Sequence, residues 1–469
     1  MRHLARALVL IELLVVVLTG CGTGPRDAAT ATATPVASPS RSPSPVASPS
    51  PSPSPIVYGP PQYRAMWVDG FNDAIKSRAQ VEKLVADAHR ANLNALLVQV
   101  RRRGDALFNR SEEPRALDIT GSRGFDPLGY LIQVAHASTP RIEVHAWLNT
   151  FFVGEESGVY LKHGDWVNRT NDGATGGYLD PGIPEVQAYT HKVFMDVARN
   201  YDVDGLHMDF VRYAGVTWGY TSASLAQYKQ DTGATGTPAP DDARWQAWRR
   251  ERVTAFVRDL HNDLKQKNPT VKLSAALICF GAGPASLAAW GGTSAYSSVF
   301  QDWADWLLKG YIDFGVPMNY DSDWIYREKG WFDRWVAFEK DSGFANRVVT
   351  GMGAFLNYPD DSLAQIRRVL APSARGNKVL GVAIYSYAAT SVYGNSDFYN
   401  STDLYSGLPR QPFAGGIPTA AGLEQRALTF NDLFMTQLSQ PADYRDVQLG
   451  VLHTQPVFTL PALVPLLPT

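Results

Sequence analysis

The sequence predicts an α/β fold, a (β/α)8 TIM barrel that follows an N-terminal signal and a Ser/Pro-rich linker. From Tyr63 onward, eight short apolar runs of β type alternate with helical patterns, which is the repeat typical of this barrel. The chain of 469 residues is 45% hydrophobic and 11% aromatic, enough to fill one large core. Polar residues gather where several of the runs end, as a site at one mouth of a barrel requires.

The N-terminus predicts a lipoprotein signal peptide over residues 1–20. Basic residues precede an apolar run over residues 7–18, which is interrupted only by Glu12. The run is too short for a spanning helix. It ends in Leu18-Thr19-Gly20-Cys21, which resembles the lipobox of bacterial lipoproteins. That resemblance implies cleavage before Cys21 and lipidation of its thiol, so we expect an extracytoplasmic protein anchored to a membrane.

The same run leaves a second interpretation open. Leu10-Ile11-Glu12-Leu13-Leu14 also resembles the methylated N-terminus of prepilins, which are surface subunits. Alignment on Glu12 places Ala7 where prepilins usually carry Gly, and this favours the lipoprotein. A mature N-terminus at Cys21 would distinguish the two.

Residues 21–60 are expected to form a disordered linker. Thr, Ala, Ser and Pro dominate this segment, and Ser-Pro repeats between Ser38 and Pro55. Such a composition cannot bury enough apolar area to fold, and the prolines keep the chain extended. The segment is therefore predicted to be a stalk that holds a globular domain off a membrane.

The barrel is expected over residues 61–440 and a C-terminal tail over residues 441–469. The expected strands are 64–70, 95–101, 142–149, 205–212, 272–279, 314–320, 347–355 and 379–387. The expected helices are 77–91, 127–137, 184–201, 242–267, 301–309, 326–342 and 362–371, with a closing helix over 419–440. Because strands and helices alternate, the strands should be parallel and should end at one common face.

Two connections are long, and both follow strands. Residues 150–184 carry Trp166, Asn168 and Tyr178, and residues 214–241 carry Trp218, Tyr220 and Tyr228. In a barrel these loops lie at the C-terminal face, where ligands bind. Surface insertions that are stabilised by their aromatic residues are the alternative.

The fourth expected strand carries the most informative polar residues. Because side chains alternate along a strand, one face should hold Leu206, Met208 and Phe210 and the other His207, Asp209 and Val211. A carboxylate on a buried strand is costly unless a site uses it. Asp209 is therefore the expected catalytic acid or nucleophile. A structural ion pair between Asp209 and Arg212 is the alternative.

Residues at the ends of the other strands are expected to converge on the same cavity. Asp321 is the expected catalytic partner of Asp209, with helix capping as the alternative role. The expected substrate-binding residues are Trp67, Asp69, Arg101, Asp105, His145, Trp147, Asn149, His207, Arg212, Tyr320, Tyr385 and Tyr387. Cleavage of a glycosidic bond needs one carboxyl to protonate the leaving oxygen and a second group to stabilise positive charge, while aromatic rings stack on sugars. The residue types therefore predict glycoside chemistry.

Other classes of function are disfavoured. The net charge is −2 with acids and bases dispersed, so the chain has no basic stripe for nucleic acid. Compact His spacing, a phosphate loop, a dinucleotide fingerprint and a Gly-x-Ser-x-Gly elbow are all missing from the sequence, so no metal or cofactor is expected. Once Cys21 is lipidated, Cys279 has no cysteine partner and no disulfide is expected. Nothing in the sequence indicates an oligomeric state.

Several ordered segments resemble the glycosyl hydrolase-like 10 family. They are residues 63–68, 94–108, 125–128, 144–149, 179–186 and 203–213, with weaker similarity to about residue 390. The resemblance implies a (β/α)8 hydrolase of envelope polysaccharide with Asp209, His207 and Arg212 in its active site. Some members of the family act on peptidoglycan glycan strands, especially strands that lack stem peptides.

A more distant resemblance to chitinase-type barrels is only partial. Residues 204–211 follow their Asp-Gly-x-Asp-x-Asp-x-Glu strand, and residues 318–321 follow their Met-x-Tyr-Asp strand. However, Val211 stands at the position of the proton-donating Glu, and His207 replaces one of the aspartates. The roles of chitinase residues therefore cannot be carried over to this chain.

The expected function is hydrolysis of glycosidic bonds in an extracytoplasmic polysaccharide, with peptidoglycan glycan strands or another N-acetylhexosamine polymer favoured. One alternative is a non-catalytic carbohydrate-binding barrel of the cell envelope, and another is a prepilin-like surface subunit. Two carboxyls that face each other at catalytic spacing would distinguish a hydrolase from a binding barrel.

Overall fold

The computed structural model describes residues 55–392, 431–446 and 450–468. One compact unit spans Val57–Thr469, and Met1–Ile56 fall outside it. The expected signal peptide, most of the expected linker and the first part of the expected closing helix lie outside the described residues. Among those described, none of the helices is both long and apolar enough to cross a membrane.

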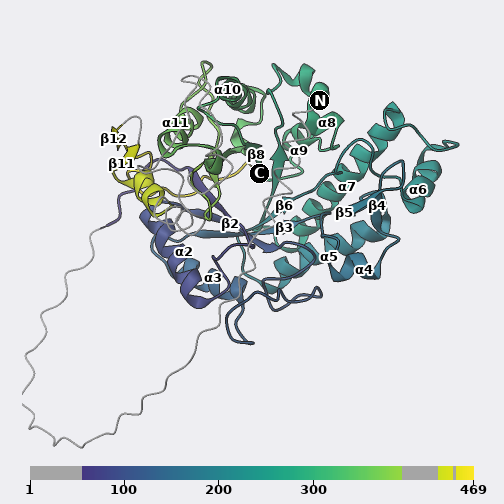
Figure 1. The fold of residues 1–469 in the computed structure, drawn as a ribbon, viewed down its shortest axis with the longest axis horizontal. Helices are drawn as coiled ribbons and strands as arrows, with labels where there is room; N and C mark the ends of the chain where they lie inside the picture. The colour runs from purple at the N-terminus through teal and green to yellow at the C-terminus, as the bar shows by residue number, and fades with distance from the viewer. Residues whose placement is uncertain (1–54, 393–430, 447–449, 469) are drawn as a thin grey trace, which may run out of the picture. The chain divides into compact units, whose positions relative to one another are not determined.

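Eight parallel strands close into a barrel, in the order β1-β10-β9-β8-β7-β6-β3-β2 (Figure 1). The strands are β1 (Tyr63–Val68), β2 (Ala95–Arg101), β3 (Glu143–Asn149), β6 (Gly205–Asp209), β7 (Lys272–Ile278), β8 (Phe314–Asn319), β9 (Val349–Gly353) and β10 (Gly381–Tyr385). Each lies within one of the expected strands or begins one residue before it. The predicted (β/α)8 barrel is confirmed.

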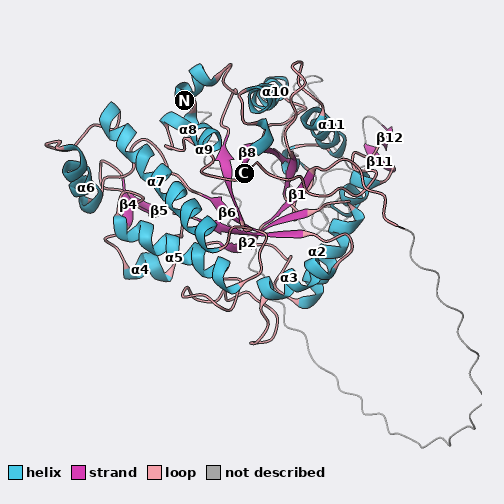
Figure 2. Cartoon of the chain, turned by 180° about the vertical axis from the view of Figure 1, so that it is seen from behind, coloured by secondary structure: helices cyan, strands magenta, loops and turns pink. Residues whose placement is uncertain are grey.

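Helices cover the outside of the barrel (Figure 2). Those at the positions that the sequence predicted are α2 (Arg78–Arg90), α3 (Pro127–Ala137), α5 (Pro184–Asn200), α7 (Ala243–Lys267), α9 (Trp303–Lys309), α10 (Tyr326–Asp341) and α11 (Pro359–Leu370). Side-chain caps begin several of them: Ser77, Asp126 and Asp242 accept hydrogen bonds from backbone N–H groups of the first turn. Three further helices, α4 (Gly158–Lys162), α6 (Ser222–Thr232) and α8 (Ser294–Ser297), lie in the connections.

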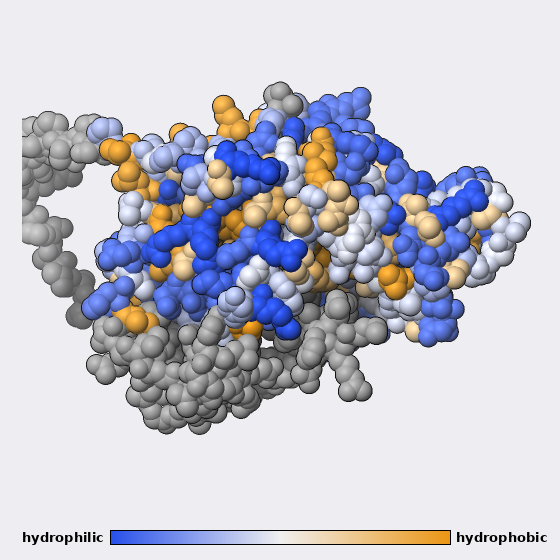
Figure 3. Space-filling model, turned by 90° about the horizontal axis from the view of Figure 1, so that it is seen from above, coloured by the Kyte–Doolittle hydropathy of each residue, from blue (hydrophilic) through white to orange (hydrophobic). Residues whose placement is uncertain are grey.

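The core has two parts because side chains alternate along each strand. The outward row of the strands packs against the helices, as Leu206 and Met208 do. The inward row fills the barrel with a second cluster that includes Trp67 and Trp147. Apolar residues form only small separate groups on the mainly hydrophilic face in Figure 3, as expected when the apolar sides of the elements face inward.

The two long connections contain structure of their own. Residues 150–184 form α4 and a hairpin of β4 (Val167–Arg169) and β5 (Thr175–Leu179). Residues 214–241 contain α6 and are tied to α7 by Arg249, whose guanidinium donates to the carbonyl oxygens of Val216 at 2.7 Å and Trp218 at 2.6 Å. Both follow strand ends and therefore lie on the C-terminal side of the barrel.

The end of β6 corrects one expectation. The strand stops at Asp209, because Phe210 adopts a left-handed backbone conformation with φ +50°. This break ends the alternation, and Val211 packs in the outer core instead of sharing the face of Asp209.

The chain after the barrel closes its N-terminal end. Residues 431–439 are helical, and β11 (Ala442–Asp446) pairs with β12 (Gly450–Thr454) in a hairpin. The final segment then crosses the starts of β1 and β2: the carbonyl oxygen of Leu463 accepts from the backbone N–H of Gln62 at 2.9 Å. Val464 and Leu467 pack against the interior cluster. The segment that the sequence left as a tail is therefore part of the fold.

Candidate active site

Four aromatic side chains from four strands meet at the C-terminal mouth. The ring of Trp67 lies 6.0 Å from that of Tyr385 and 6.2 Å from that of Tyr320. Trp147 lies 6.4 Å from Tyr385, measured between ring centroids. Trp67 and Trp147 are buried, whereas Tyr320 and Tyr385 are half-buried. The two tryptophans therefore form the floor of the group, and the tyrosines reach solvent.

Trp67 can take its place because the neighbouring strand carries a glycine. A Cβ atom at Gly351 would lie 2.6 Å from the indole of Trp67, closer than any packed side chain allows. The absence of a side chain on β9 thus makes room for the largest side chain of β1 inside the barrel.

Asp209 lies beside this aromatic group at the end of β6. Burial raises the pKa values of both Tyr320 and Tyr385, and the charge of Asp209 adds to both rises, which indicates that its carboxylate lies near both phenols. Burial raises the pKa of Asp209 itself to about 6, although the charge of Arg212 and the backbone N–H of Phe210, at 2.6 Å, oppose that rise. The carboxyl can therefore exchange its proton close to neutral pH.

Two buried donors close to Asp209 lack a partner within the described part of the chain. The indole N–H of Trp147 lowers the pKa of Asp209, yet it has no well-aligned acceptor. Arg212 is only 4% exposed; it donates to the Tyr178 hydroxyl at 3.1 Å, lies over the Phe210 ring, and leaves its Nε unpaired. Such donors are free to bind oxygen atoms of a ligand.

Asp321 follows β8 and is also buried. Burial and the charge of Glu328 raise its pKa to about 8, and its Oδ2 has no hydrogen-bond partner among the described residues. Its backbone carbonyl is held by Asn357 at 3.1 Å and Gln365 at 3.0 Å. Neither Asp321 nor Asp209 shifts the pKa of the other. The two carboxyls are therefore not electrostatically paired, and their expected partnership in one cavity stays a prediction.

Asp69 is the second carboxylate near the phenol of Tyr385, whose pKa both Asp69 and Asp209 raise. One oxygen of Asp69 accepts from the backbone N–H groups of Phe71 at 3.1 Å and Asn72 at 3.0 Å, which folds the loop after β1. The charges of Asp69 and Asp209 thus both act on the Tyr385 phenol, whereas that of Asp321 does not.

Amide side chains join the ends of β1, β2 and β3. Gln99 accepts from the backbone N–H of Gly70 at 3.0 Å and donates to Asn149 at 3.1 Å, and Asn149 donates to the carbonyl of Arg102 at 2.7 Å. Asn149 also lies in register with Asp209 on the adjacent strand. The network fixes the rim beside Asp209. Alternation with Leu97 on β2 was the signal that could have identified Gln99.

The two histidines lie deeper than the mouth, and neither is exposed. His207 accepts from the indole N–H of Trp67 at 3.0 Å and contacts the Ser274 hydroxyl at 2.9 Å, and burial lowers its pKa well below the usual value. His145 contacts Glu143 at 3.0 Å. A bound sugar could touch either imidazole only if the aromatic floor moved, so both act here as supports beneath the mouth.

Arg101 and Asp105 organise the loop that follows β2. Arg101 is fully buried and forms a two-pronged ion pair with Glu113, at 2.7 and 2.6 Å. Asp105 pairs with Arg102 at 2.5 Å. Glu113 lies in a loop with no strand or helix pattern, so no sequence signal pointed to it.

Tyr387 is placed apart from the other candidates. Its hydroxyl donates to Asp87 of α2 at 2.7 Å, so the side chain points into the helix layer and away from the aromatic group. Its expected contact with substrate stays a prediction that this position does not favour.

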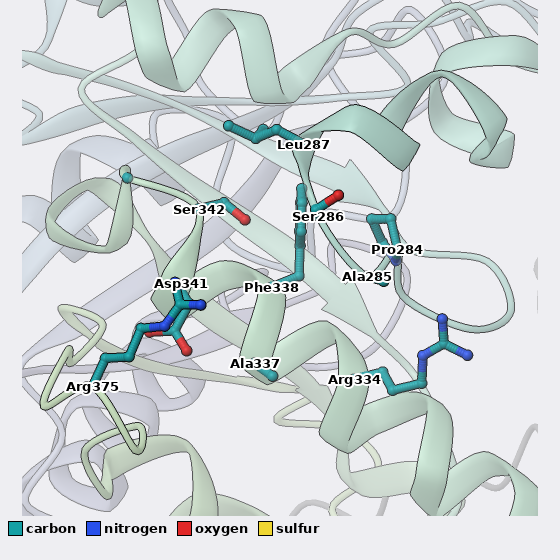
Figure 4. Close-up of a pocket in the computed structure, with 11 residues that line it drawn as sticks. Pro284, Ala285, Ser286, Leu287, Arg334, Ala337, Phe338, Asp341, Ser342 and Arg375 are labelled. Atoms are coloured by element: carbon teal, nitrogen blue, oxygen red, sulfur yellow. The ribbon is translucent and has the colours of Figure 1, made fainter.

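A surface hollow of about 680 Å³ lies elsewhere, between residues 284–287 and the C-terminal half of α10 (Figure 4). None of the expected site residues lines it. In the figure, Arg334 and Arg375 lie at opposite ends of the hollow and do not converge. In the described part of the chain, no group of three His, Cys, Asp or Glu side chains is arranged to hold a metal ion.

The chain is similar in sequence to a known protein family and to curated proteins. Residues 62–334 match the model of the family described as glycosyl hydrolase-like 10. Glycosyl hydrolase YngK of Bacillus subtilis (strain 168) is 28% identical over 257 residues, which are 51% of this chain and 48% of that protein. Glycosyl hydrolase DigH of Escherichia coli (strain K12) is 26% identical over 279 residues, 52% and 58% of the two chains. The chain thus spans about half the length of these curated relatives.

A solved structure shares the fold. The PgaB (BpsB) glycoside hydrolase domain from Bordetella bronchiseptica has a TM-score of 0.53 at 14% identity, covering 72% of this chain and 97% of that domain. At this identity, the likeness shows a common barrel architecture and carries no residue roles.

Proposed function

This chain belongs to the glycosyl hydrolase-like 10 family, and we propose that it hydrolyses glycosidic bonds in an extracytoplasmic polysaccharide. Peptidoglycan glycan strands or another N-acetylhexosamine polymer are the favoured substrates. The observation that carries the proposal is Asp209, a buried carboxyl whose pKa is raised to about 6 beside a group of aromatic rings. This combination suits a proton donor beneath a stacked sugar.

In the proposed reaction, protonated Asp209 donates to the leaving glycosidic oxygen. The carboxylate that results is stabilised by the charge of Arg212 and by the N–H of Phe210 at 2.6 Å. The unpaired N–H of Trp147 is placed to hold a sugar oxygen next to the same carboxyl. General acid catalysis of this kind typically contributes roughly 10² to 10⁴-fold in rate.

The second group of the reaction can come from the protein or from the substrate. Asp321 is the proposed partner, but it has no electrostatic contact with Asp209. A retaining pair would need a separation of about 5 to 5.5 Å, at which two carboxyls shift each other strongly. The lack of such a shift favours a substrate whose own N-acetyl group attacks the sugar carbon, with Asp321 orienting it.

Digestion of purified peptide-free glycan strands, chitin oligomers and α-glucans with residues 57–469 tests the proposal. We expect new reducing ends from one of the two N-acetylhexosamine polymers and none from α-glucans. Product anomers followed by NMR distinguish inversion from the retaining routes. Cleavage of the α-glucans alone would refute the proposed substrate class.

A carbohydrate-binding barrel without activity is the second candidate function. The lack of coupling between Asp209 and Asp321 favours it over a retaining hydrolase with two protein carboxyls, because such a pair would lie about 5 to 5.5 Å apart and shift each other's pKa. Tight binding of N-acetylhexosamine oligomers with no cleavage over long incubations would support this candidate over hydrolysis.

We also propose that the mature protein is a lipoprotein that begins at Cys21, with a prepilin-like subunit as the alternative. The proposal rests on the sequence Leu18-Thr19-Gly20-Cys21 and on the Pro-rich segment that follows it. Mass spectrometry of the membrane-extracted protein should show a diacylglyceryl-Cys peptide. An unmodified Cys21 inside a longer peptide would contradict the proposal, and Cys21→Ser should abolish membrane retention.

A further inference from the structure

One end of the barrel carries an apolar surface that the proposed reaction does not use. Five of the twelve large apolar side chains that the described residues expose lie in two short segments: Val57, Tyr58, Leu460, Leu463 and Leu466. We call them the basal patch. Leu466 is 97% exposed and Val57 is 68% exposed. A protein that stays monomeric in water rarely gathers such side chains on one surface.

Backbone contacts place the two segments side by side. Gly59 and Ala462 form a parallel bridge, and the N–H of Gly59 donates to the carbonyl of Pro461 at 2.8 Å. Neither segment contains a charged residue: residues 57–62 read Val-Tyr-Gly-Pro-Pro-Gln, and residues 455–468 carry no Asp, Glu, Lys, Arg or His. The patch is therefore continuous in backbone and uniformly uncharged.

Neighbouring residues of the final segment point in opposite directions. Val464 and Leu467 pack inward against the core of the barrel, which fixes the backbone. Leu463 and Leu466 consequently face outward, and their exposure follows from a held conformation. The exposed apolar surface of these two leucines is therefore available to a partner.

The patch lies at the end of the barrel opposite the candidate active site. It contacts the starts of β1 and β2, through Gln62 and Asn94, whereas Asp209 stands at the end of β6. Because all eight strands are parallel, the starts and the ends of strands lie on opposite faces. The compact unit begins at Val57, inside the patch, so the residues that precede it are attached covalently at this face.

We propose that the basal patch rests on the lipid surface of the membrane to which the chain is tethered, with the mouth at Asp209 directed away from it. This inference rests on the proposed lipid anchor. Exposed leucines, a tyrosine and uncharged backbone suit the boundary between headgroups and acyl chains. The apolar area alone gives a weak bilayer affinity, but a tether about 33 residues long, able to extend roughly 100 Å, raises the local concentration of the membrane.

The test places a polarity-sensitive fluorophore at Leu466→Cys, in the compact unit and in the full lipidated chain. Cys279 is buried, so the probe goes to the new thiol. With vesicles of phosphatidylethanolamine and phosphatidylglycerol, we expect a blue shift and increased emission. Leu161→Cys is the matched control, because Leu161 is 72% exposed on the loop after β3, on the side of the mouth. Its fluorescence should stay that of a probe in water.

Flotation of the fragment 55–469 with the same vesicles gives the second measurement. Leu463→Asp/Leu466→Asp should bind at least about tenfold more weakly, because two leucines that would enter the lipid are lost and two charges face it instead. Leu161→Asp should bind like the unchanged fragment. Binding should persist at about 0.5 M salt, where charge attraction is screened within a few Å.

The outcomes separate this inference from the lipid anchor. A Leu466 probe that stays in water while the lipidated chain is bound to vesicles would overturn the inference and leave the anchor intact. A probe that changes with protein concentration and without vesicles would overturn it in favour of contact between two copies. If the fragment binds lipid while Cys21 of the full chain is unmodified, the inference about the basal patch is supported and the proposed lipid anchor is refuted.

Discussion

At the scale of single residues, Asp209 is a carboxyl group in a buried position that is unfavourable for its charge. The side chain is 8% exposed, and its burial favours the neutral carboxyl. Phe210, with φ +50°, turns its N–H onto one carboxyl oxygen at 2.6 Å. Backbone in a sparsely populated region is found at functional sites, where the surrounding structure holds it in place. The candidate acid and the left-handed backbone of Phe210 therefore coincide at one strand end.

Asp209→Asn should lower the rate of glycan cleavage by roughly 10² to 10⁴-fold, because an amide cannot donate the proton while the volume hardly changes. The folded protein holds this carboxyl at a pKa of about 6, above its ordinary 3.8, so its contribution to stability is lost as pH rises through 6. The variant should therefore melt at a higher temperature than the wild type at pH 8 but not at pH 3. Wild-type cleavage rates in the variant would contradict the assignment.

Arg212→Gln should shift the pH dependence of cleavage upward. A general acid works while protonated, so activity should fall as pH rises above about 6. The charge of Arg212 lowers the pKa of Asp209, and removing this charge should raise that pKa and move the basic limb to higher pH. Measurement of kcat/KM against pH checks the shift. Arg212→Lys keeps the charge and should leave the limb near its wild-type position.

At the scale of elements, the loops after the strands are held by buried charges. Arg101 and Glu113 are both buried and form two short contacts, and Tyr189 donates to Glu113 at 2.5 Å. Arg101 also donates to backbone carbonyls of Asn149 and Thr150 at the end of β3. One guanidinium thus ties the loop after β2 to the strand next to β6, and so to the surroundings of Asp209.

Glu113→Gln should destabilise the protein by about 3 to 5 kcal/mol, because it leaves the Arg101 charge buried without its partner. Glu112→Gln is the matched control: Glu112 pairs with Lys192 at the surface, where both side chains are more than half exposed. An exposed pair contributes about 0 to 1 kcal/mol. Urea unfolding of the two variants measures the difference, and equal losses would contradict the role given to Arg101.

At the scale of the whole molecule, the barrel is filled along its length and closed at its base. Lys272, Glu143 and Tyr63 form a hydrogen-bonded cluster on the N-terminal side, with Lys272 at 2.6 Å from Glu143. Burial raises the pKa of Glu143, but His145 and Lys272 outweigh it and hold that pKa at about 2. Val464 and Leu467 pack against the same interior. The C-terminal segment therefore acts as the last layer of the barrel.

Val464→Ala/Leu467→Ala should lower the free energy of unfolding by about 1 to 3 kcal/mol, because both side chains are half-buried against the interior. Leu466→Ala removes the same leucine atoms from a position that is 97% exposed and should have little effect. Thermal melts of the two variants make the comparison. A loss for Leu466→Ala as large as that for the double variant would show that the outward leucine also carries packing.

The sequence alone was enough to identify the barrel and to single out Asp209 as a candidate residue. Eight apolar runs alternated with helical patterns, and each became a barrel strand because period and length are properties of the local chain. The cost of burying a charge is also visible locally, so Asp209 stood out before its neighbours were known. The aromatic residues at the ends of β1, β3, β8 and β10 followed from the parallel topology.

Which of these polar residues face one another depends on the tertiary structure. His207 contacts Trp67 and Ser274, and Tyr387 contacts Asp87, and each of these contacts joins distant parts of the chain. Arg101 pairs with Glu113, which lies in a loop without a strand or helix pattern. Because Phe210 adopts a left-handed conformation, Val211 packs in the outer core. Val464 and Leu467 of the final segment pack against the interior of the barrel. Periodicity reports which way a side chain points along its own element, whereas partners depend on how separate elements meet in space, and this is set by packing of the whole core.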